Sequence, residues 1–351
     1  MNGMSITLHS VVLACVALSL ASGCDDWREA PDAGFGDLLA VEIDSLDALE
    51  LNVGSIEDVS ASTEGRLFGL DRRNMQVVAL DADGTVLYTM GRQGAGPGEF
   101  SEPRRLALGD SLLVVGDRNS RFSVFARGGS FRNSFVVPGI RFMNSNLTIV
   151  GDSVVAIAGY IEGPDNLLAG RLVHLVDVDG TRRADVVPLS QAATAAESVT
   201  TAGASVAVQK DMLWAIQTTE YALHRVDRKT GAESEPLYLQ PEYYRPLLDV
   251  EPPMPALLDW LRGFDSPSGL YALGDSVLLV VVSLTSHQPF KYSLDFVDTR
   301  SGTVLHSLVR DGKVVGVDTA RQIIFVEGEL EPDEQVGWLE RYRYSFVARD
   351  A

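Results

Sequence analysis

Arginine side chains gather in one part of this sequence, and arginine is well suited to bind an oxyanion. Residues 66–141 contain eleven arginines and seven acidic residues, a local net charge of +4, whereas the whole chain has a formal net charge of −19. A guanidinium group can donate two parallel hydrogen bonds to a carboxylate or phosphate. Seven arginines lie beside predicted turns, where several can converge on an anionic ligand or an acidic partner segment: Arg72, Arg73, Arg104, Arg105, Arg118, Arg121 and Arg141. The alternative is a general preference for arginine over lysine, with these side chains facing different directions.

Carboxylate and amide side chains near the same turns have the oxygen atoms that calcium prefers. The candidate metal ligands are Asp71, Asn74, Asp117, Asn119 and Asn144. Such side chains also commonly accept hydrogen bonds from the backbone of their own turn, and we favour that interpretation for Asp117 and Asn119. We therefore predict no cofactor, and a calcium or zinc ion only if the chain is an enzyme.

Histidines and nucleophile motifs do not form a catalytic pattern. Beyond residue 23 the histidines are His174, His224, His287 and His306. His174 and His224 occupy matching places three residues before a turn aspartate, which favours a packing role. The Gly-x-Ser-x-Gly motif is absent, and the glycine-rich stretch 91–98 lacks the lysine and the following helix of a phosphate loop. We predict no catalytic residue.

A proline-rich and aromatic segment spans residues 236–264. It is too long for a hairpin and too aromatic for a linker, so we interpret it as an insertion. One hypothesis is a lid over one face of the domain, with Tyr243, Tyr244 and Trp260 as the side chains that cover it. The alternatives are a structural plug that buries these aromatics and a surface that captures carbohydrate.

The first 24 residues have the pattern of a cleaved export signal. Residues 5–23 contain no Asp, Glu, Lys or Arg, and the apolar core is too short to span a bilayer comfortably. Small residues precede Cys24, and this run resembles the lipobox of bacterial lipoproteins. The resemblance implies cleavage after residue 23, a lipid on Cys24 and attachment to a membrane of the bacterial cell envelope, inner or outer. An ordinary secretory signal cut near Gly23 is the alternative.

Cysteine usage and charge restrict the rest of the chain. Cys15 is the only other cysteine, so the body after Cys24 has neither a disulfide nor a thiolate metal site. The acidic surface repels nucleic acid and anionic headgroups, which leaves the lipid as the means of membrane attachment.

The residues above belong to a unit that recurs at a spacing of roughly 40 to 50 residues. Its first element is an apolar strand that ends in an Asp- and Gly-rich turn, at residues 77–84, 172–180, 223–231 and 294–302. Its second element is a Gly-Asp-Ser turn before a β-branched run, at residues 109–111, 151–153 and 274–276. Helical periodicity is almost absent, so each unit predicts a small antiparallel sheet.

Six such units follow one another along the chain. They cover residues 56–100, 101–139, 140–190, 201–239, 269–310 and 312–347. The last unit has only three obvious strands, and the strand near residues 39–43 can supply the fourth. We therefore predict an all-β, six-bladed β-propeller with antiparallel four-stranded blades, whose ring is closed by pairing the N- and C-terminal strands.

One unit also carries a family resemblance. Residues 91–103, 112–119 and 121–125 combine a glycine-rich loop, a proline, an apolar strand, Asp117, Asn119, Arg121 and a second apolar strand. This pattern resembles the NHL repeat, and the preceding unit matches it in part through Asp71 and Asn74. Six-bladed NHL-like propellers are common among bacterial lipoproteins, so this resemblance agrees with that of the N-terminal signal.

The expected organisation is a signal peptide at residues 1–23, an acidic tether at 24–38 after the lipidated cysteine, and a propeller at 39–351 with its insertion near 236–264. The expected function is a non-catalytic binding or scaffolding module in the cell envelope. One propeller face would bind a protein, a peptide or an anionic ligand, and not nucleic acid. The alternative is a metal-dependent propeller lyase or lactonase with a carboxylate and amide site on the central axis.

Overall fold

A computed structural model describes residues 39–51, 53–142, 145–162, 168–189, 203–247, 263–285, 290–328 and 337–348. Residues 40–347 belong to one unit of mutually contacting segments. Its described residues form strands and turns, with no helix. Consequently, no helix in these ranges is long and apolar enough to cross a membrane.

Four sheets have four strands each, hydrogen-bonded in sequence order with antiparallel neighbours. The first contains β6 (Pro103–Leu108), β7 (Leu112–Asp117), β8 (Arg121–Ala126) and β9 (Phe131–Val136). The second contains β11 (Leu147–Val150), β12 (Val154–Ala158), β15 (Arg171–Asp177) and β16 (Arg182–Pro188). The third contains β17 (Ala204–Gln209), β18 (Met212–Gln217), β19 (Glu220–Asp227) and β20 (Glu233–Tyr238). The fourth contains β21 (Ser266–Ala272), β22 (Val277–Leu284), β23 (Lys291–Asp298) and β24 (Val304–Arg310).

A larger sheet joins the two ends of the unit. Its eight strands are, in spatial order, β1 (Leu39–Leu51), β27 (Gly337–Ala348), β26 (Ile323–Glu327), β25 (Val314–Asp318), β2 (Ile56–Ala61), β3 (Leu67–Asp71), β4 (Gln76–Leu80) and β5 (Val86–Met90). The parallel pair β2 and β25 joins two groups of four strands, with Val59 opposite Gly316. A Cβ atom on Gly316 would lie 2.1 Å from the Val59 carbonyl oxygen, so this close approach requires glycine.

A small three-stranded sheet accompanies the others. It contains β10 (Ile140–Arg141), β13 (Tyr160–Glu162) and β14 (Leu168–Ala169).

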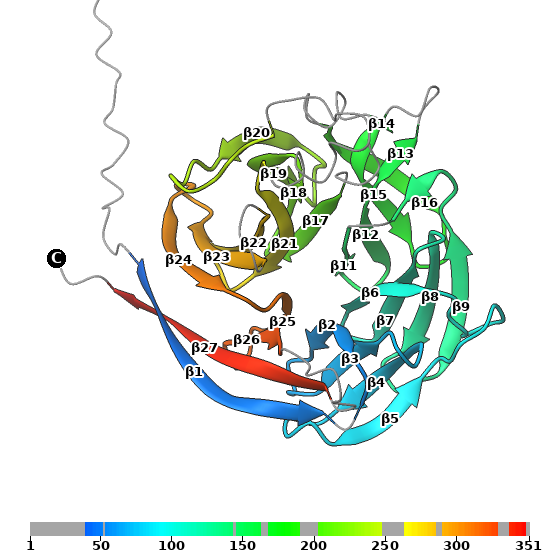
Figure 1. The fold of residues 1–351 in the computed structure, drawn as a ribbon. Coiled ribbons are helices and arrows are strands. Elements are labelled where there is room, and N and C mark those ends of the chain that lie inside the picture. Colours follow the sequence, from blue (N-terminus) through cyan, green and yellow to red (C-terminus); the bar gives the residue numbers. More distant parts are fainter. Residues whose placement is uncertain are drawn as a thin grey trace, which may run out of the picture. The chain divides into compact units, whose positions relative to one another are not determined.

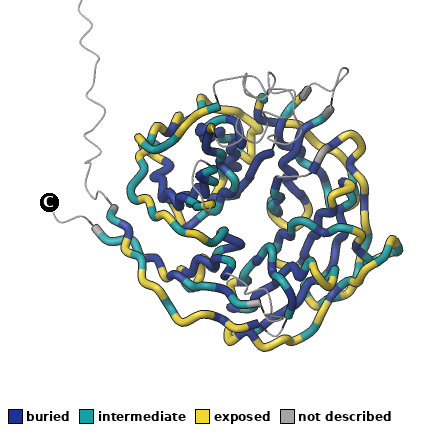
Figure 2. The backbone as a smooth tube through the Cα atoms, in the orientation of Figure 1, coloured by how far each residue is buried: buried dark blue, intermediate teal, exposed yellow. Residues whose placement is uncertain are grey.

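Burial changes from strand to strand in the way the sequence pattern dictates. Every residue of β7 is buried, as its continuous apolar run requires, whereas β9 alternates between more and less exposed positions. Figure 2 shows the same trend, with buried segments toward the centre and exposed segments on the outer strands. Neighbouring sheets bury their apolar faces against each other, as where Phe122 and Phe135 of one sheet pack with Val155 and Ile157 of the next.

The innermost strands meet around a common centre (Figure 1). β2 contacts β6, β6 contacts β11, β11 contacts β17, β17 contacts β21 and β21 contacts β25, which pairs with β2. The all-β class and the four-stranded antiparallel sheets confirm that part of the prediction. Of the predicted insertion, residues 248–262 lie outside the described residues.

Candidate functional site

A cavity of about 210 Å³ lies among the innermost strands. Because side chains alternate along a strand, each of these strands turns some residues toward the cavity and others into the packing between sheets. The polar and charged residues that line it are Glu57, Asp58, Ser60, Arg105, Ser145, Asn146, Thr148, Ser205, Ser268, Tyr271 and Lys313. We call this space the central cavity.

Asp58, on β2, is a half-buried carboxylate that lines the cavity. Its Oδ2 accepts a hydrogen bond from the Leu106 backbone N–H of β6 at 2.7 Å. Burial raises the pKa of Asp58 from 3.8 to about 6, although Arg105, this hydrogen bond and Lys313 each oppose the rise. Asp58 therefore links two innermost strands and titrates near neutrality.

Asn146 makes a similar link further round the cavity. Its Oδ1 accepts from the Val206 N–H at 2.6 Å, and its Nδ2 donates to the Val206 carbonyl at 3.2 Å. Both hydrogen bonds join the chain just before β11 to β17, so part of the polar lining holds the strands together.

Two cations line the cavity near Asp58. Lys313 lies just before β25, and burial, followed by the charge of Arg105, lowers its pKa. With the other described residues, the Lys313 ammonium makes neither a hydrogen bond nor an ion pair within 4 Å. Arg105 lies on β6, and its one side-chain hydrogen bond to the described residues runs from Nη1 to the Arg104 carbonyl at 2.9 Å.

Tyr271 and Glu327 complete the surroundings of these charges. The Tyr271 hydroxyl is 3.5 Å from the Val314 carbonyl, and burial raises its pKa, with a further contribution from Asp58. Burial also raises the pKa of Glu327, which Lys313 opposes. The cavity thus combines one titrating carboxylate, two cations without carboxylate partners at ion-pair distance among the described residues, and a tyrosine hydroxyl.

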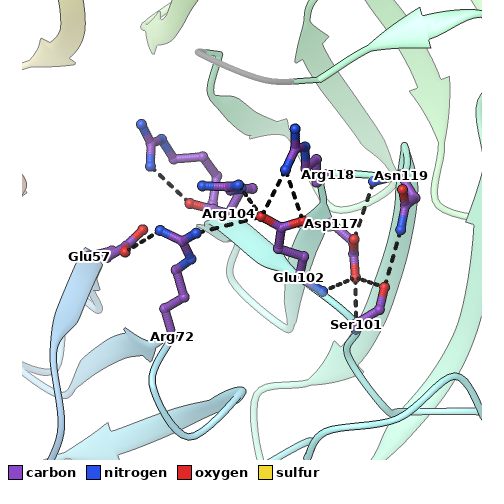
Figure 3. Close-up of polar contacts among 9 residues, drawn as sticks. Glu57, Arg72, Ser101, Glu102, Arg104, Asp117, Arg118 and Asn119 are labelled. Carbon is purple, nitrogen blue, oxygen red and sulfur yellow. Dashed lines mark hydrogen bonds and ion pairs between the residues drawn. The ribbon is translucent and has the colours of Figure 1, made fainter.

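Other arginines gather beside the cavity around Glu102 (Figure 3). Glu102 Oε1 lies 3.5 Å from Arg72 Nη2 and 3.3 Å from Arg118 Nη1, and it also accepts a hydrogen bond from Arg104 Nη2. Arg72 Nη1 additionally binds Glu57 Oε1 at 2.7 Å, and Glu57 borders the cavity. We call these five residues the Glu102 cluster.

The seven predicted anion-binding arginines therefore have different surroundings. Three converge, but on Glu102, which belongs to this chain. Arg121 donates to the Ala95 and Gly96 carbonyls at 2.9 and 2.7 Å, within the glycine-rich loop. Arg73 makes no side-chain hydrogen bond or ion pair with another described residue, and only the backbone of Arg141 is described, paired with Tyr160.

The predicted metal ligands Asp71 and Asp117 accept hydrogen bonds from backbone and side-chain donors of this chain. Asp71 accepts hydrogen bonds from Asn74 N at 3.1 Å and Asn74 Nδ2 at 2.7 Å. Asp117 accepts from Ser101 N at 3.0 Å, Ser101 Oγ at 2.9 Å and Glu102 N at 2.9 Å. Asn119 donates its N–H to Asp117 at 3.2 Å, and Asn144 lies outside the described residues.

Within the described ranges, no three His, Cys, Asp or Glu residues lie close enough to hold a metal ion. The carboxylate oxygens of Asp71 and Asp117 also already accept from N–H and O–H donors, which does not favour a metal centre on these two residues.

The predicted lid residues pack into the domain where they are described. Tyr243 and Tyr221 both donate hydrogen bonds to Oδ2 of the fully buried Asp295, and Ser293 Oγ donates to its Oδ1 at 2.7 Å. The Tyr244 ring lies 4.7 Å from the Tyr221 ring. Trp260, like Cys24, lies outside the described residues.

Two of the histidines occupy buried positions with acidic partners. His174 Nδ1 lies 2.8 Å from Asp185 Oδ1, and burial lowers its pKa. His224 Nε2 lies 3.3 Å from Glu220 Oε2. His306 lies on the outer strand β24, and His287 is outside the described residues.

Comparison with known proteins places the fold. A member of the DUF4221 family from Bacteroides vulgatus has a TM-score of 0.66 at 11% identity, covering 88% of this chain and 99% of its own. A protein described as exported, from Bacteroides fragilis, has a TM-score of 0.58 at 12% identity over 86% and 95% of the two chains. A catalytically inactive virginiamycin B lyase from Staphylococcus aureus, solved with quinupristin, has a TM-score of 0.51 at 11% identity over 86% and 99%. The chain has a β-propeller-like fold.

These similarities are to the fold alone, because all three identities are low. No family model matches the chain, and no curated protein matches it. The function of this propeller-like chain must therefore be argued from its own side chains.

Of the polar residues that line the central cavity, sequence reasoning named Arg105 and missed the others, among them Asp58, Tyr271 and Lys313. Two signals could have found the charged pair. Asp58 is a charged residue within a predicted innermost strand, and Lys313 directly precedes the corresponding strand of the last unit. Charged side chains are uncommon in a strand core unless they face a cavity or a partner.

Proposed function

We propose that this chain is a six-bladed, NHL-like propeller that acts as a non-catalytic binding module in the bacterial cell envelope, with its ligand in the central cavity. The sheet order supports the six-bladed interpretation, since β1 beside β27 completes a group of four strands next to β25 and β26. The parallel pair β2 and β25 then joins the first and last blades.

The observation that carries the binding role is the polar lining of the central cavity. Propellers commonly place ligands where their innermost strands meet. Here Lys313 and Arg105 line that space without a carboxylate partner at ion-pair distance among the described residues. Charged groups in such surroundings are costly unless something compensates them. A bound ligand would provide that compensation.

The envelope location rests on the N-terminal sequence. The apolar segment and the small residues before Cys24 support a lipid anchor on that cysteine. The similar protein from Bacteroides fragilis is described as exported, which agrees with a location outside the cytoplasm. Labelling of the full chain with a palmitate analogue in a bacterial host, and its loss in C24A, tests the anchor.

The metal-dependent lyase or lactonase is the weaker proposal for this chain. Asp71 accepts a hydrogen bond from Asn74 of its own turn, Asp117 accepts one from the Ser101 N–H, and Asp58 accepts one from the Leu106 N–H. Within the described ranges, none of these carboxylates belongs to a group of three His, Cys, Asp or Glu side chains that could hold a metal ion.

A pair of matched substitutions tests binding in the central cavity. Thr148 lines the cavity and Thr89 lies exposed on the outer strand β5. The full chain in mild detergent is screened by thermal unfolding against a panel of small polar molecules, charged and neutral. We expect at least one to raise the melting temperature of the wild type and T89F, but not of T148F, because phenylalanine fills the cavity. Equal stabilisation of all three proteins, or of none, contradicts the proposal.

A further inference from the structure

The central cavity has an excess of unused hydrogen-bond donors. Lys313 has three N–H donors, and Arg105 has several beyond the one used on the Arg104 carbonyl. The Tyr271 hydroxyl has only its 3.5 Å contact with the Val314 carbonyl among the described residues. The facing carboxylate, Asp58, already accepts from the Leu106 N–H. A ligand that satisfies this lining must therefore bring acceptors.

The charges around the cavity also favour a ligand that carries hydrogen-bond acceptors. The Glu57 carboxylate, at the edge, is bound by Arg72. Asp58 is the remaining carboxylate in the described lining, and it faces both Arg105 and Lys313. With Glu57 paired to Arg72, two cations face one carboxylate in this lining, within a chain whose formal net charge is −19.

The Glu102 cluster adds to this local excess. Its three arginines outnumber its two glutamates, and the cluster meets the cavity at Glu57. Positive charge of this kind attracts anions over a distance of roughly 10 Å at ordinary ionic strength. The surroundings therefore favour entry of the same type of ligand.

The size of the cavity limits the ligand. A volume of about 210 Å³ is below the roughly 300 to 1,000 Å³ typical of sites for drug-sized ligands. A small molecule fits, or one end of a larger one.

We propose that Lys313 and Arg105 bind the oxyanion group, carboxylate or phosphate, of a small ligand in the central cavity, with Tyr271 as a further donor. The inference rests on the proposed binding function and names its ligand class. An oxyanion accepts several hydrogen bonds at once and compensates both cations, which a neutral or cationic ligand does not do.

The probes are succinate and inorganic phosphate, with succinamide as the neutral counterpart of succinate. Binding to the full chain in mild detergent is measured by calorimetry at constant ionic strength, beside the thermal unfolding screen. We expect succinate or phosphate to bind and succinamide not to bind. The anion that binds distinguishes a carboxylate ligand from a phosphate ligand.

Charge variants locate the site. K313M and R105Q should each weaken binding of that anion on the order of tenfold or more, whereas K313R should retain most of it. The control is K229Q, because Lys229 is exposed and paired with Asp211 at 2.7 Å. K313R also guards against misfolding, since it keeps the charge and the approximate length of the side chain.

The outcomes separate the two proposals. Equal affinity of the anions for wild type, K313M and R105Q overturns the inference. A neutral compound that binds the wild type but not T148F, while neither anion binds, also overturns it and leaves the central cavity as a binding site. Failure of every compound in the panel overturns the proposed function itself.

Discussion

Two groups of cations differ in what they contact: one lines the central cavity, and the other meets that cavity only through Glu57. Arg72, Arg104 and Arg118 surround the carboxylate of Glu102, so each of them has an acidic partner within the chain. Lys313 and Arg105 line the cavity without such a partner among the described residues. A high local density of arginine therefore does not by itself identify a ligand site. Our proposal rests instead on two cations that line a cavity and have no ion-pair partner among the described residues.

The largest expected effect concerns Asp58, the carboxylate that lines the cavity together with Lys313 and Arg105. Its pKa of about 6 lies above the 3.8 of an unperturbed aspartate, so the folded state holds the proton more tightly than the unfolded state. The contribution of Asp58 to the free energy of unfolding is therefore present at low pH. It declines by at most about 3 kcal/mol as the pH rises from about 4 to about 7.

D58N removes this titration and keeps an oxygen that can accept from the Leu106 N–H. Urea unfolding at several pH values should show the wild type losing stability relative to D58N as the pH rises through 6. The control is D83N, since Asp83 is exposed in a turn. A difference between wild type and D58N that does not change with pH would contradict the raised pKa of Asp58.

A smaller effect is expected when the internal partner of the arginines is removed. E102Q loses the charge that three arginines share, and its free energy of unfolding should fall by about 1 to 2 kcal/mol, more at low salt. The freed arginines should also increase the affinity for phosphate. Denaturant unfolding and calorimetry measure the two effects. E99Q is the matched control, because Glu99 pairs with the exposed Arg92; an equal loss in both variants would refute a shared network.

Single arginine substitutions should rank by exposure. The Arg104 side chain is 22% exposed and that of Arg118 is 47% exposed. R104Q should therefore destabilise more than R118Q, with R118Q below about 1 kcal/mol, because solvent screens the more exposed pair. Chemical denaturation of the two variants checks the order, and the reverse order would mean that the pairs act independently of burial.

The smallest effect is expected from metal removal. The oxygens of Asp71 and Asp117 accept hydrogen bonds from neighbouring N–H and O–H groups. Calcium or EDTA should leave the melting temperature of the full chain unchanged within error. A rise of several degrees in melting temperature with calcium, reversed by EDTA, would favour the metal-dependent enzyme over the binding module.

Local sequence signals predicted the strands and the turns well, because period-two patterns and Asp-Gly turns act over a few residues. The hydrogen bond from the Asn119 N–H to Asp117, within one turn, is of this local kind. The direction of an arginine depends instead on distant partners, as Arg72 depends on Glu102. Local patterns could not reveal that three of the predicted anion-binding arginines form ion pairs with a carboxylate of the same chain.

The central cavity was harder to predict for the same reason. Asp58 and Lys313 come together only because β2 pairs with β25 from the other end of the domain. The sequence around Tyr243 likewise shows no partner for its hydroxyl, which donates a hydrogen bond to Asp295 of β23. The aromatic pattern around it predicted an insertion, but not the buried carboxylate that holds it.

The joining of β2 to β25 also sets an order of events during synthesis. The strand with Asp58 leaves the ribosome near the start, whereas β25 to β27 are made last. Until then β1 and β2 present open edges, which are the parts of a sheet most prone to pair with the wrong chain. For an exported chain, this interval spans nearly the whole passage across the membrane. In a chain cut short before residue 314, β2 would still pair with β3, but its other edge would stay open and β1 would lack the β27 strand that lies beside it.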